Sequence, residues 1–313
     1  MNSKIFLIGV GKMGTEYAKV LKGLGKDFIA IGRSTESAKK FKEATGVEAL
    51  EGGLASYLSE NNVEGARAIV AVDIDTASEN TELLIQAKAH SILLEKPGGV
   101  NQKEIKELKE LADRSNTKIF IGYNRHFYAS VAKASEIIKE DGGVLSFIFE
   151  FNERVDVVEK LEVSEEVKNN WFLANSSHVA DLAFHLGGKP KEFKTYRSGT
   201  LAWHPSGAVF AGSGISQSGA LFSYHANWNS GGRWSVEVMT PKRRLILKPL
   251  EELWEQKKET FEVTKIEIED SLDRSYKPGI YLETKTFLEE STGLVTLSEQ
   301  LENCFHYKEI SGE

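Results

Sequence analysis

The first part of the chain alternates between short apolar runs and amphipathic segments. Apolar, β-branched runs that predict strands lie at residues 4–8, 28–31, 68–72, 92–94 and 118–121. Segments with helical periodicity lie between them, at residues 14–24, 35–45, 80–89 and 101–114. In the last of these, Ile105, Leu108, Leu111 and Ala112 form the apolar stripe of a surface helix. Strands that alternate with helices predict a parallel sheet covered on both faces, and short right-handed connections make it doubly wound.

The pattern changes after about residue 143. Runs typical of strands then follow at residues 144–155, 192–199, 208–213, 220–228, 234–240, 244–248 and 261–268. Helical patterns remain at residues 128–139, 175–186, 280–290 and 298–305. Successive strands without intervening helices predict an antiparallel sheet. The chain is therefore expected to consist of a doubly wound α/β domain at residues 1–122 and an α+β domain at residues 123–313.

Composition and charge narrow the class of partner. The chain has 313 residues, and 46 Asp and Glu against 39 Lys and Arg give a net charge of −7. This balance, without a block of like charge, argues against nucleic acid as a partner. A single cysteine, Cys304, allows no intramolecular disulfide and fits a reducing compartment. No apolar stretch is long enough for a signal peptide or a membrane span, so we expect a cytoplasmic protein without a membrane partner.

A glycine-rich segment joins the first predicted strand to the first predicted helix. It reads Gly9-Val10-Gly11-Lys12-Met13-Gly14, which is the GxGxxG spacing of a dinucleotide-binding turn. In such a turn, Gly9 permits the tight bend, Gly11 lets the backbone approach a pyrophosphate, and Gly14 lets helix and strand pack closely. The helix N-terminus offers N–H groups and a positive dipole end to the phosphates. The alternative is a structural glycine turn without a ligand.

The end of the second predicted strand bears on the choice between NAD and NADP. An NAD site usually carries an acidic residue about 20 residues after the glycines, where it accepts from the ribose 2′-hydroxyl. Here the strand ends at Ile31-Gly32-Arg33-Ser34, without an acid. Arg33 can pair with a phosphate and Ser34 can donate to it. The alternative makes Ser34 only a helix cap and Arg33 a solvated charge. The sequence favours NADP over NAD as the cofactor.

A lysine follows the strand predicted at residues 92–94, within Glu95-Lys96-Pro97. Ligands of open α/β sheets bind beyond the carboxyl ends of the strands, so this tripeptide is expected beside the cofactor. The Lys96 ammonium can polarise a carbonyl or stabilise an alkoxide there. The alternative is an ordinary surface charge.

Several motifs occur together in a specific order: the glycine-rich turn, Glu95-Lys96-Pro97, Gly-Tyr-Asn-Arg-His-Phe at 122–127, and Tyr-Lys-Pro-Gly at 276–279. In this order they resemble the Gfo/Idh/MocA oxidoreductases, the relatives of glucose–fructose oxidoreductase and inositol dehydrogenase. The resemblance implies a Rossmann domain, a second domain with a large, mostly antiparallel open sheet, and NAD(P)-dependent hydride transfer on sugars or cyclitols. It also implies that Lys96 contacts substrate and cofactor, and that the open sheet face forms a homodimer or homotetramer.

The resemblance extends to the segment at residues 174–181, where the family pattern is roughly Asp-x-Gly-x-His-x-x-Asp. His178 matches the histidine that serves as general acid and base, and Asp181 matches the last acid. The chain departs from the pattern at Ala174 and Ser176, which replace the leading Asp and the Gly. One carboxylate is thereby lost, so His178 and Lys96 are expected to carry the proton chemistry. The Asn-Ser-Ser-His variant looks like members involved in surface-polysaccharide sugar biosynthesis.

Candidate substrate contacts are Asn124, Arg125, Trp171, Asn175 and Asp181. Arg125 suggests an anionic group on the substrate, and Trp171 offers a surface on which a sugar can stack. For Asn124 the alternative is a hydrogen bond at a helix start, and for Trp171 it is core packing. Asp181 can instead bond within the protein.

Three other interpretations remain to be weighed. His178, Asp181 and His185 share one helix face with the spacing of metal ligands, but no further ligand is evident, and no metal is expected. A cofactor-sensing regulator without catalysis would leave Lys96 and His178 without a role. An enzyme with a retained cofactor would catalyse a redox-neutral elimination or hydrolysis.

Overall fold

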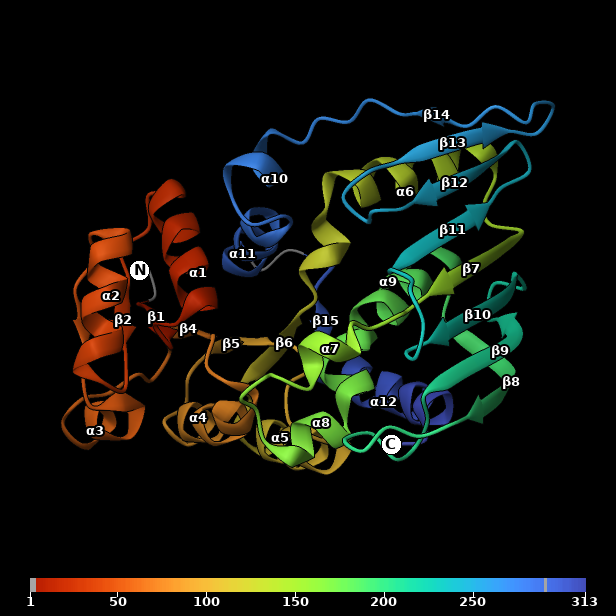
Figure 1. The fold of residues 1–313 in the computed structure, drawn as a ribbon. Helices are drawn as coiled ribbons and strands as arrows, with labels where there is room; N and C mark the ends of the chain where they lie inside the picture. Colours follow the sequence, from red (N-terminus) through yellow and green to blue (C-terminus); the bar gives the residue numbers. More distant parts are fainter. Residues whose placement is uncertain (1–3, 290–291) are drawn as a thin grey trace. The chain divides into compact units, whose positions relative to one another are not determined.

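The computed structural model describes residues 4–289 and 292–313 of the chain (Figure 1). These residues form two compact units. The first comprises Met1–Asn124 and Ser275–Glu302, and the second comprises Arg125–Arg274 and Asn303–Glu313. The chain therefore returns to the first unit late in the sequence, and the long helix α12 (Leu297–Ser311) contributes residues to both.

The first unit is built on a seven-stranded sheet. In spatial order its strands are β15 (Val295–Thr296), β6 (Lys118–Gly122), β5 (Ser91–Glu95), β4 (Arg67–Val70), β1 (Ile5–Ile8), β2 (Ile29–Ile31) and β3 (Ala49–Leu50). Neighbouring strands are parallel except β15, which pairs antiparallel with β6. All residues of β1 are buried, as expected for a strand covered on both faces. The predicted doubly wound Rossmann domain is confirmed.

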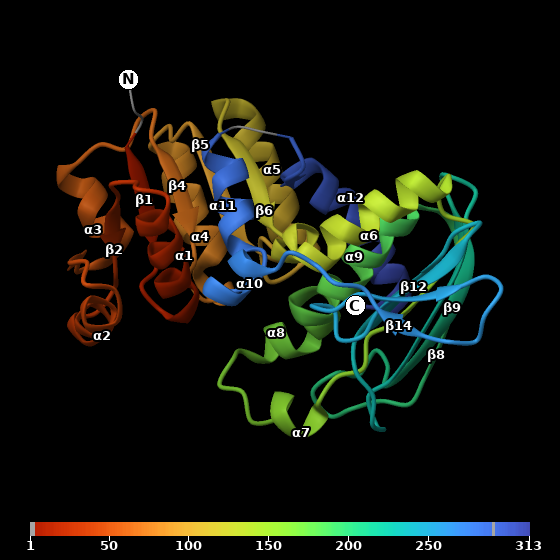
Figure 2. The same cartoon turned by 90° about the horizontal axis from the view of Figure 1, so that it is seen from above.

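Helices cover both faces of this sheet (Figures 1 and 2). They are α1 (Lys12–Gly23), α2 (Thr35–Thr45), α3 (Gly53–Glu60), α4 (Ile74–Gln86), α5 (Gln102–Ser115) and α11 (Ile280–Leu288). Helices α1, α2 and α11 pack together on one face, and α3, α4 and α5 on the other. Helix α5 buries Ile105, Leu108 and Ala112, which belong to the stripe predicted from the sequence. The sequence pattern did not indicate β3, α3 or β15, because β3 and β15 have two residues each and α3 has only about two turns. Helix α11 was expected to reach Glu290, which lies outside the described residues.

The second unit is built on an eight-stranded sheet. In spatial order its strands are β14 (Thr264–Lys265), β13 (Trp254–Lys257), β12 (Arg243–Leu247), β11 (Ser235–Met239), β7 (Ser146–Glu150), β10 (Leu221–Asn227), β9 (Val209–Ser216) and β8 (Pro190–Ser198). Every neighbouring pair is antiparallel except β7 and β10, which run parallel. The prediction of a large, mostly antiparallel sheet is confirmed.

The remaining helical elements of this unit are η1 (Asn124–Phe127), α6 (Ala129–Asp141), α7 (Val155–Val158), α8 (Glu165–Asn169), the π-helix η2 (Phe172–Ser176), α9 (Ser177–Gly187) and α10 (Ser271–Ser275). Helix α9 packs on β7 and β11. Its last residue, Gly187, allows this approach, because a Cβ there would lie 2.2 Å from the ring of Phe147. The strand predicted over residues 144–155 was too long: β7 ends at Glu150 and a short helix begins at Val155.

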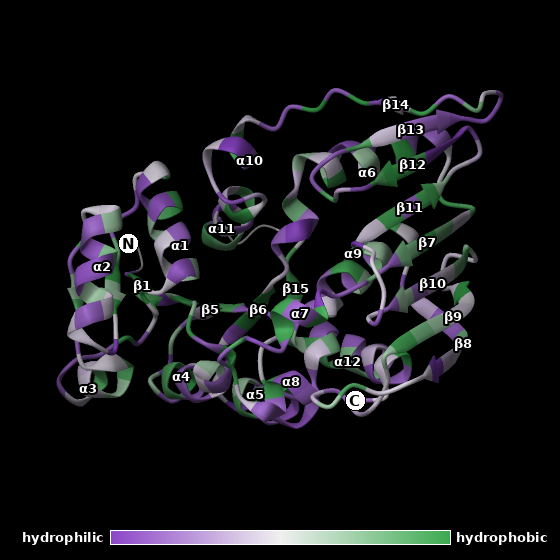
Figure 3. Cartoon of the chain, in the orientation of Figure 1, coloured by the Kyte–Doolittle hydropathy of each residue, from purple (hydrophilic) through white to green (hydrophobic). Residues whose placement is uncertain are grey.

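Hydropathy follows this arrangement (Figure 3). Strands β1 and β5 are hydrophobic, whereas β13, which lies next to the edge strand β14 of the second sheet, is hydrophilic. In the second unit, Phe147, Phe149 and Phe222 point from the sheet toward α9, where they contact Phe184. Within the described residues, no helix combines the length and the apolar character needed to cross a bilayer.

Candidate active site

The glycine-rich turn forms a cradle at the carboxyl end of β1. Gly9 has a φ of 98°, and a Cβ there would lie 2.3 Å from the carbonyl oxygen of Ala71. A Cβ on Gly14 would lie 2.0 Å from the carbonyl oxygen of Gly9, so any side chain would push α1 away from the turn. Gly11, in contrast, faces open space, with no atom within 4 Å of the position of a Cβ. The space next to Gly11 is therefore open, which suits the close approach of a phosphate to the backbone.

The start of α1 borders the same cradle. Lys12 and Met13 open the helix, and the preceding Gly11 makes no side-chain cap to it. The first-turn N–H groups of a helix have no partner within the helix, and they carry a partial positive charge. The cradle and the helix end together fit a pyrophosphate group.

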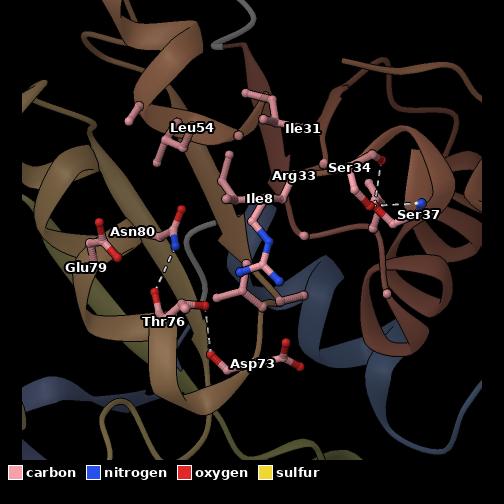
Figure 4. A pocket seen from close by; sticks show the side chains of 18 of the residues that line it. Ile8, Ile31, Arg33, Ser34, Ser37, Leu54, Asp73, Thr76, Glu79 and Asn80 are labelled. Carbon is pink, nitrogen blue, oxygen red and sulfur yellow. Dashed lines mark hydrogen bonds between the residues drawn. The ribbon is translucent and has the colours of Figure 1, made fainter. Parts of the chain in front are cut away.

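A cavity of about 360 Å³ continues from the cradle along the ends of β1, β2 and β4 (Figure 4). Arg33 extends its guanidinium into this cavity, and Ser34 and Ser37 lie beside it at the start of α2. The Ser34 hydroxyl accepts a hydrogen bond from the Ser37 N–H (3.3 Å), so Ser34 does cap α2. The acidic residues of the cavity, Asp73 and Glu79, lie on the α4 side and not at the end of β2. The β2 end thus presents one cation and two hydroxyl groups, a set that suits a phosphate ester.

Glu95 is the last residue of β5, and Lys96 and Pro97 directly follow it, so the tripeptide lies at the carboxyl end of the strand as the sequence predicted. The Tyr17 hydroxyl lies 2.8 Å from Oε1 of Glu95 and 3.1 Å from Oε2 of Glu283, which comes from α11. Gln300 at the start of α12 donates to the carbonyl oxygen of Pro97 (2.8 Å). Two segments from late in the sequence therefore fix the turn that carries Lys96.

Proton counting assigns a charge state to this cluster. Tyr17 has one hydroxyl proton but two neighbouring carboxyl groups, so one of these groups must carry its own proton. Glu283 is fully buried, and burial together with the charge of Glu95 raises the pKa of Glu283 well above its usual range. Glu283 is therefore the neutral partner, which leaves Glu95 as the carboxylate next to Lys96.

Replacement of Glu283 by Gln gives a stability difference that depends on pH. In the unfolded chain Glu283 loses its proton above about pH 4.3, whereas in the folded protein it retains the proton. A rise in pH above that value therefore favours the unfolded wild-type chain. The free energy of unfolding of the wild type should fall relative to that of E283Q, by up to about 1.4 kcal/mol per pH unit.

Urea unfolding of both proteins between about pH 5 and about pH 8 measures this trend. E289Q, which removes an exposed carboxylate at the end of the same helix, is the matched control and should show no such trend. If the E283Q difference is constant over this range, the assignment of a buried neutral Glu283 is wrong.

Asn124 ends the first unit and is buried. Its side-chain amide donates to the carbonyl oxygen of Pro278 (2.9 Å), in the segment before α11. The neighbouring Tyr123 hydroxyl donates to Oε1 of Gln300 (3.1 Å). Asn124 therefore joins the end of β6 to the Tyr-Lys-Pro-Gly segment.

His178 lies in the first turn of α9 and is 8% exposed. Its ring centroid is 6.2 Å from that of Trp234, which precedes β11. The Arg125 guanidinium lies over the same tryptophan, 4.9 Å from the ring centroid. The fold thus brings Arg125 and His178 to one half-exposed aromatic ring. The sequence analysis did not select Trp234, because a lone tryptophan after a glycine turn has no distinguishing pattern.

Asp181 lies one turn after His178 and is bonded within the second unit. Its Oδ2 is 2.5 Å from Nε2 of His126, and its Oδ1 is 3.5 Å from the amide of Asn303 and the hydroxyl of Tyr307. His185 stacks on His126 with 3.9 Å between ring centroids. Among residues 4–289 and 292–313, no group of three or more His, Cys, Asp and Glu side chains could hold a metal ion.

The segment before His178 is a π-helix, in which the Ser177 N–H bonds to the carbonyl oxygen of Phe172, five residues earlier. The Glu313 carboxylate accepts hydrogen bonds from the N–H groups of Phe172 (2.6 Å) and Leu173 (3.1 Å). It also lies 2.8 Å from Nε2 of the fully buried His204. π-Helical turns are frequent at functional sites, and this one leads directly into α9.

Asn175 and Ser176 at the end of the π-helix both bond to Glu153. The Asn175 amide lies 3.1 and 2.9 Å from the two carboxylate oxygens, and the Ser176 hydroxyl donates to Oε1 at 2.6 Å. Trp171 is 7% exposed and packs edge-on against Trp203. Sequence inspection did not select Glu153, because it lies in a separate segment after β7.

Comparison with known proteins places these features in context. Residues 3–123 match the family model described as "Oxidoreductase family, NAD-binding Rossmann fold". Myo-inositol 2-dehydrogenase from Thermotoga maritima is 25% identical over 191 residues, which cover 60% of this chain and 56% of that protein. The match therefore spans a little over half the length of that relative.

Solved structures with the same fold extend over nearly the whole chain. Levoglucosan dehydrogenase in complex with NADH superposes with a TM-score of 0.78 at 16% identity, covering 99% of this chain and 96% of that one. UDP-N-acetylglucosamine 3-dehydrogenase from Acidithiobacillus ferrooxidans superposes with a TM-score of 0.75 at 13% identity, covering 100% and 97%. At these identities the structural likeness establishes the fold.

Proposed function

We propose that this chain, whose residues 3–123 match the Gfo/Idh/MocA family model, is an NADP-dependent oxidoreductase that acts on a sugar or sugar derivative. The reaction is hydride transfer between the nicotinamide and a secondary alcohol or ketone. The observation that carries this proposal is the open space at Gly11, which continues into a cavity lined by Arg33. Both features suit NADP, the first for its pyrophosphate and the second for its 2′-phosphate.

The cofactor residues divide by the part of the dinucleotide that they would hold. Gly9, Gly11 and Gly14, with Lys12 and Met13, would bind the pyrophosphate. Arg33 and Ser34 would bind the 2′-phosphate, in preference to the 2′-hydroxyl of NAD. Glu95, Lys96 and Pro97 would border the nicotinamide end. When bound, the nicotinamide supplies the hydride acceptor for oxidation or the hydride donor for reduction.

His178 would transfer the hydroxyl proton of the substrate, and Lys96 would stabilise the negative charge on the substrate oxygen. In oxidation, the His178 imidazole accepts the hydroxyl proton of the substrate, and in reduction it returns that proton. An imidazole with an unperturbed pKa of about 6.5 suits both directions. The Lys96 ammonium stabilises the negative charge that develops on the substrate oxygen.

The proposed substrate contacts are Asn124, Arg125, Trp171, Asn175 and Asp181. Arg125 would bind an anionic group of the substrate, which fits a sugar nucleotide used in surface-polysaccharide synthesis. The internal bonds of Asn124 and Asp181, and the burial of Trp171, support a role for these three in shaping the site.

We also propose that the protein is a cytoplasmic homodimer or homotetramer that assembles through the second sheet. The face of this sheet opposite to α9 carries Ile148, Ile215, Leu221 and Met239, around a groove of about 830 Å³. Leu221 is 62% exposed, which favours a covered face in an assembly.

The test is a turnover assay that follows nicotinamide absorbance with NADP⁺ or NAD⁺. The candidate substrates are UDP-N-acetylglucosamine, myo-inositol and levoglucosan. We expect turnover with at least one sugar and a kcat/KM for NADP⁺ at least about 10-fold above that for NAD⁺, which corresponds to one charge-assisted hydrogen bond. Product formation without any net absorbance change would indicate a retained cofactor instead. If neither NADP⁺ nor NAD⁺ binds to the protein, the proposed function is wrong.

A further inference from the structure

Glu153 is a carboxylate that the π-helix fixes next to the first turn of α9. Two consecutive side chains, Asn175 and Ser176, give it three short contacts of 2.6–3.1 Å. The Ser176 side chain is fully buried, and Glu153 itself is half-buried. A carboxylate that accepts several hydrogen bonds is favoured in its charged form. The network therefore places a fixed negative charge at the entry of α9.

The spacing along the helix brings this charge near His178. Asn175 and Ser176, which bond to Glu153, lie three and two residues before His178, directly before the first turn of α9. The stretch between Phe172 and Ser177 contains no titratable side chain of its own. Glu153 thus brings to this stretch a charge that its own sequence lacks.

The other charged groups around His178 in the second unit offset one another. Asp181, one turn further along α9, is paired with His126 of η1, on which His185 stacks. Arg125 places a positive charge on the Trp234 ring that also contacts His178, and this charge disfavours a protonated imidazole.

The elements that pack against α9 carry further carboxylates on their other faces. Glu150 of β7 and Glu237 of β11 alternate with residues buried beneath the helix, and they bond to Lys248 and Arg244 respectively. Glu153 bonds to the segment leading into α9 through the Asn175 and Ser176 side chains, and Glu313 bonds to the start of that segment through the N–H groups of Phe172 and Leu173.

We propose that Glu153 is a positioning residue of the active site, which fixes the π-helix before His178 and stabilises the protonated imidazole that forms when His178 takes a proton. This inference rests on the proposed function for its role in turnover. The effect on His178 can be measured without a substrate, so the two proposals can fail separately.

The experiment is a pH titration of the His178 ring by NMR, in the full-length wild type and in E153Q. The resonance is assigned from its absence in H178Q. Because Gln is nearly isosteric with Glu but neutral, the titration midpoint should move to lower pH by about half a unit to one unit. E150Q is the matched control: it removes a nearby carboxylate at the end of β7 that bonds to Lys248, and the midpoint should stay at the wild-type value.

E153A is made in parallel, and thermal unfolding identifies which variants are folded. An unchanged His178 midpoint in a folded Glu153 variant would overturn the proposal, as would an equal shift in E150Q. If the midpoint moves as expected but the wild type turns over no sugar, the Glu153 inference stands and the proposed function fails. When a substrate is available, the acid limb of the kcat profile should move in the same direction as the midpoint.

Discussion

Replacing His178 with Ala is expected to lower kcat by about 10²- to 10⁴-fold, the usual contribution of a positioned general acid or base. His178 lies at the start of α9, 8% exposed and beside the Trp234 ring. The Michaelis constant for NADP⁺ should change little, because the residues proposed to hold the dinucleotide belong to the first unit. Steady-state kinetics with the best sugar of the panel gives both values.

H90Q is the control for removal of a histidine. His90 precedes β5 at the amino end of the parallel sheet, opposite to the strand ends that border the cofactor cavity. Its replacement should leave kcat within about twofold, as expected for a substitution away from the site. If H178A retains wild-type kcat while its fold is intact, His178 is not the acid–base group.

Replacing Arg33 with Asp is expected to reverse the cofactor preference. The change removes a charge-assisted hydrogen bond worth about 1.5–3 kcal/mol and places a carboxylate where the 2′-phosphate would bind. The ratio of kcat/KM for NADP⁺ to that for NAD⁺ should fall by about 100-fold or more. An Asp at the end of β2 can also accept from the ribose 2′-hydroxyl, so the value for NAD⁺ itself should rise.

K39D is the matched control for this charge reversal, because Lys39 is exposed in the second turn of the same helix α2. Its cofactor ratio should stay close to that of the wild type. A ratio that is equally insensitive to R33D would show that Arg33 is only a solvated charge, which is the alternative that the sequence left open.

Local sequence patterns were sufficient to predict the fold of the first unit. The alternation of strands and helices, the glycines between β1 and α1, and the Ser34 cap depend on residues close in sequence, and the structure contains them. The position of Lys96 after a buried strand could be predicted for the same reason. The sequence also showed that the second domain is rich in antiparallel strands.

Long-range contacts could not be predicted in this way. The Tyr17–Glu283 contact joins residues 266 apart, and neither side chain belongs to a motif that indicates the other. Strand β15 has two residues and is stable only through its pairing with β6. The prediction that β7 extends to residue 155 was wrong because β-branched valines also fill the short helix at Val155–Val158.

The candidate site also combines features that local sequence patterns predict with features that depend on long-range contacts. The sequence by itself determined the cofactor cradle and the chemical types of Lys96 and His178, because a glycine turn and a strand end are local features. Only the tertiary structure decided what surrounds them: the neutral Glu283 under the Glu95 carboxylate, the His126 pair of Asp181, and the Glu153 carboxylate before α9. Burial and neighbouring charges set the protonation state of a side chain, and packing between distant segments creates both.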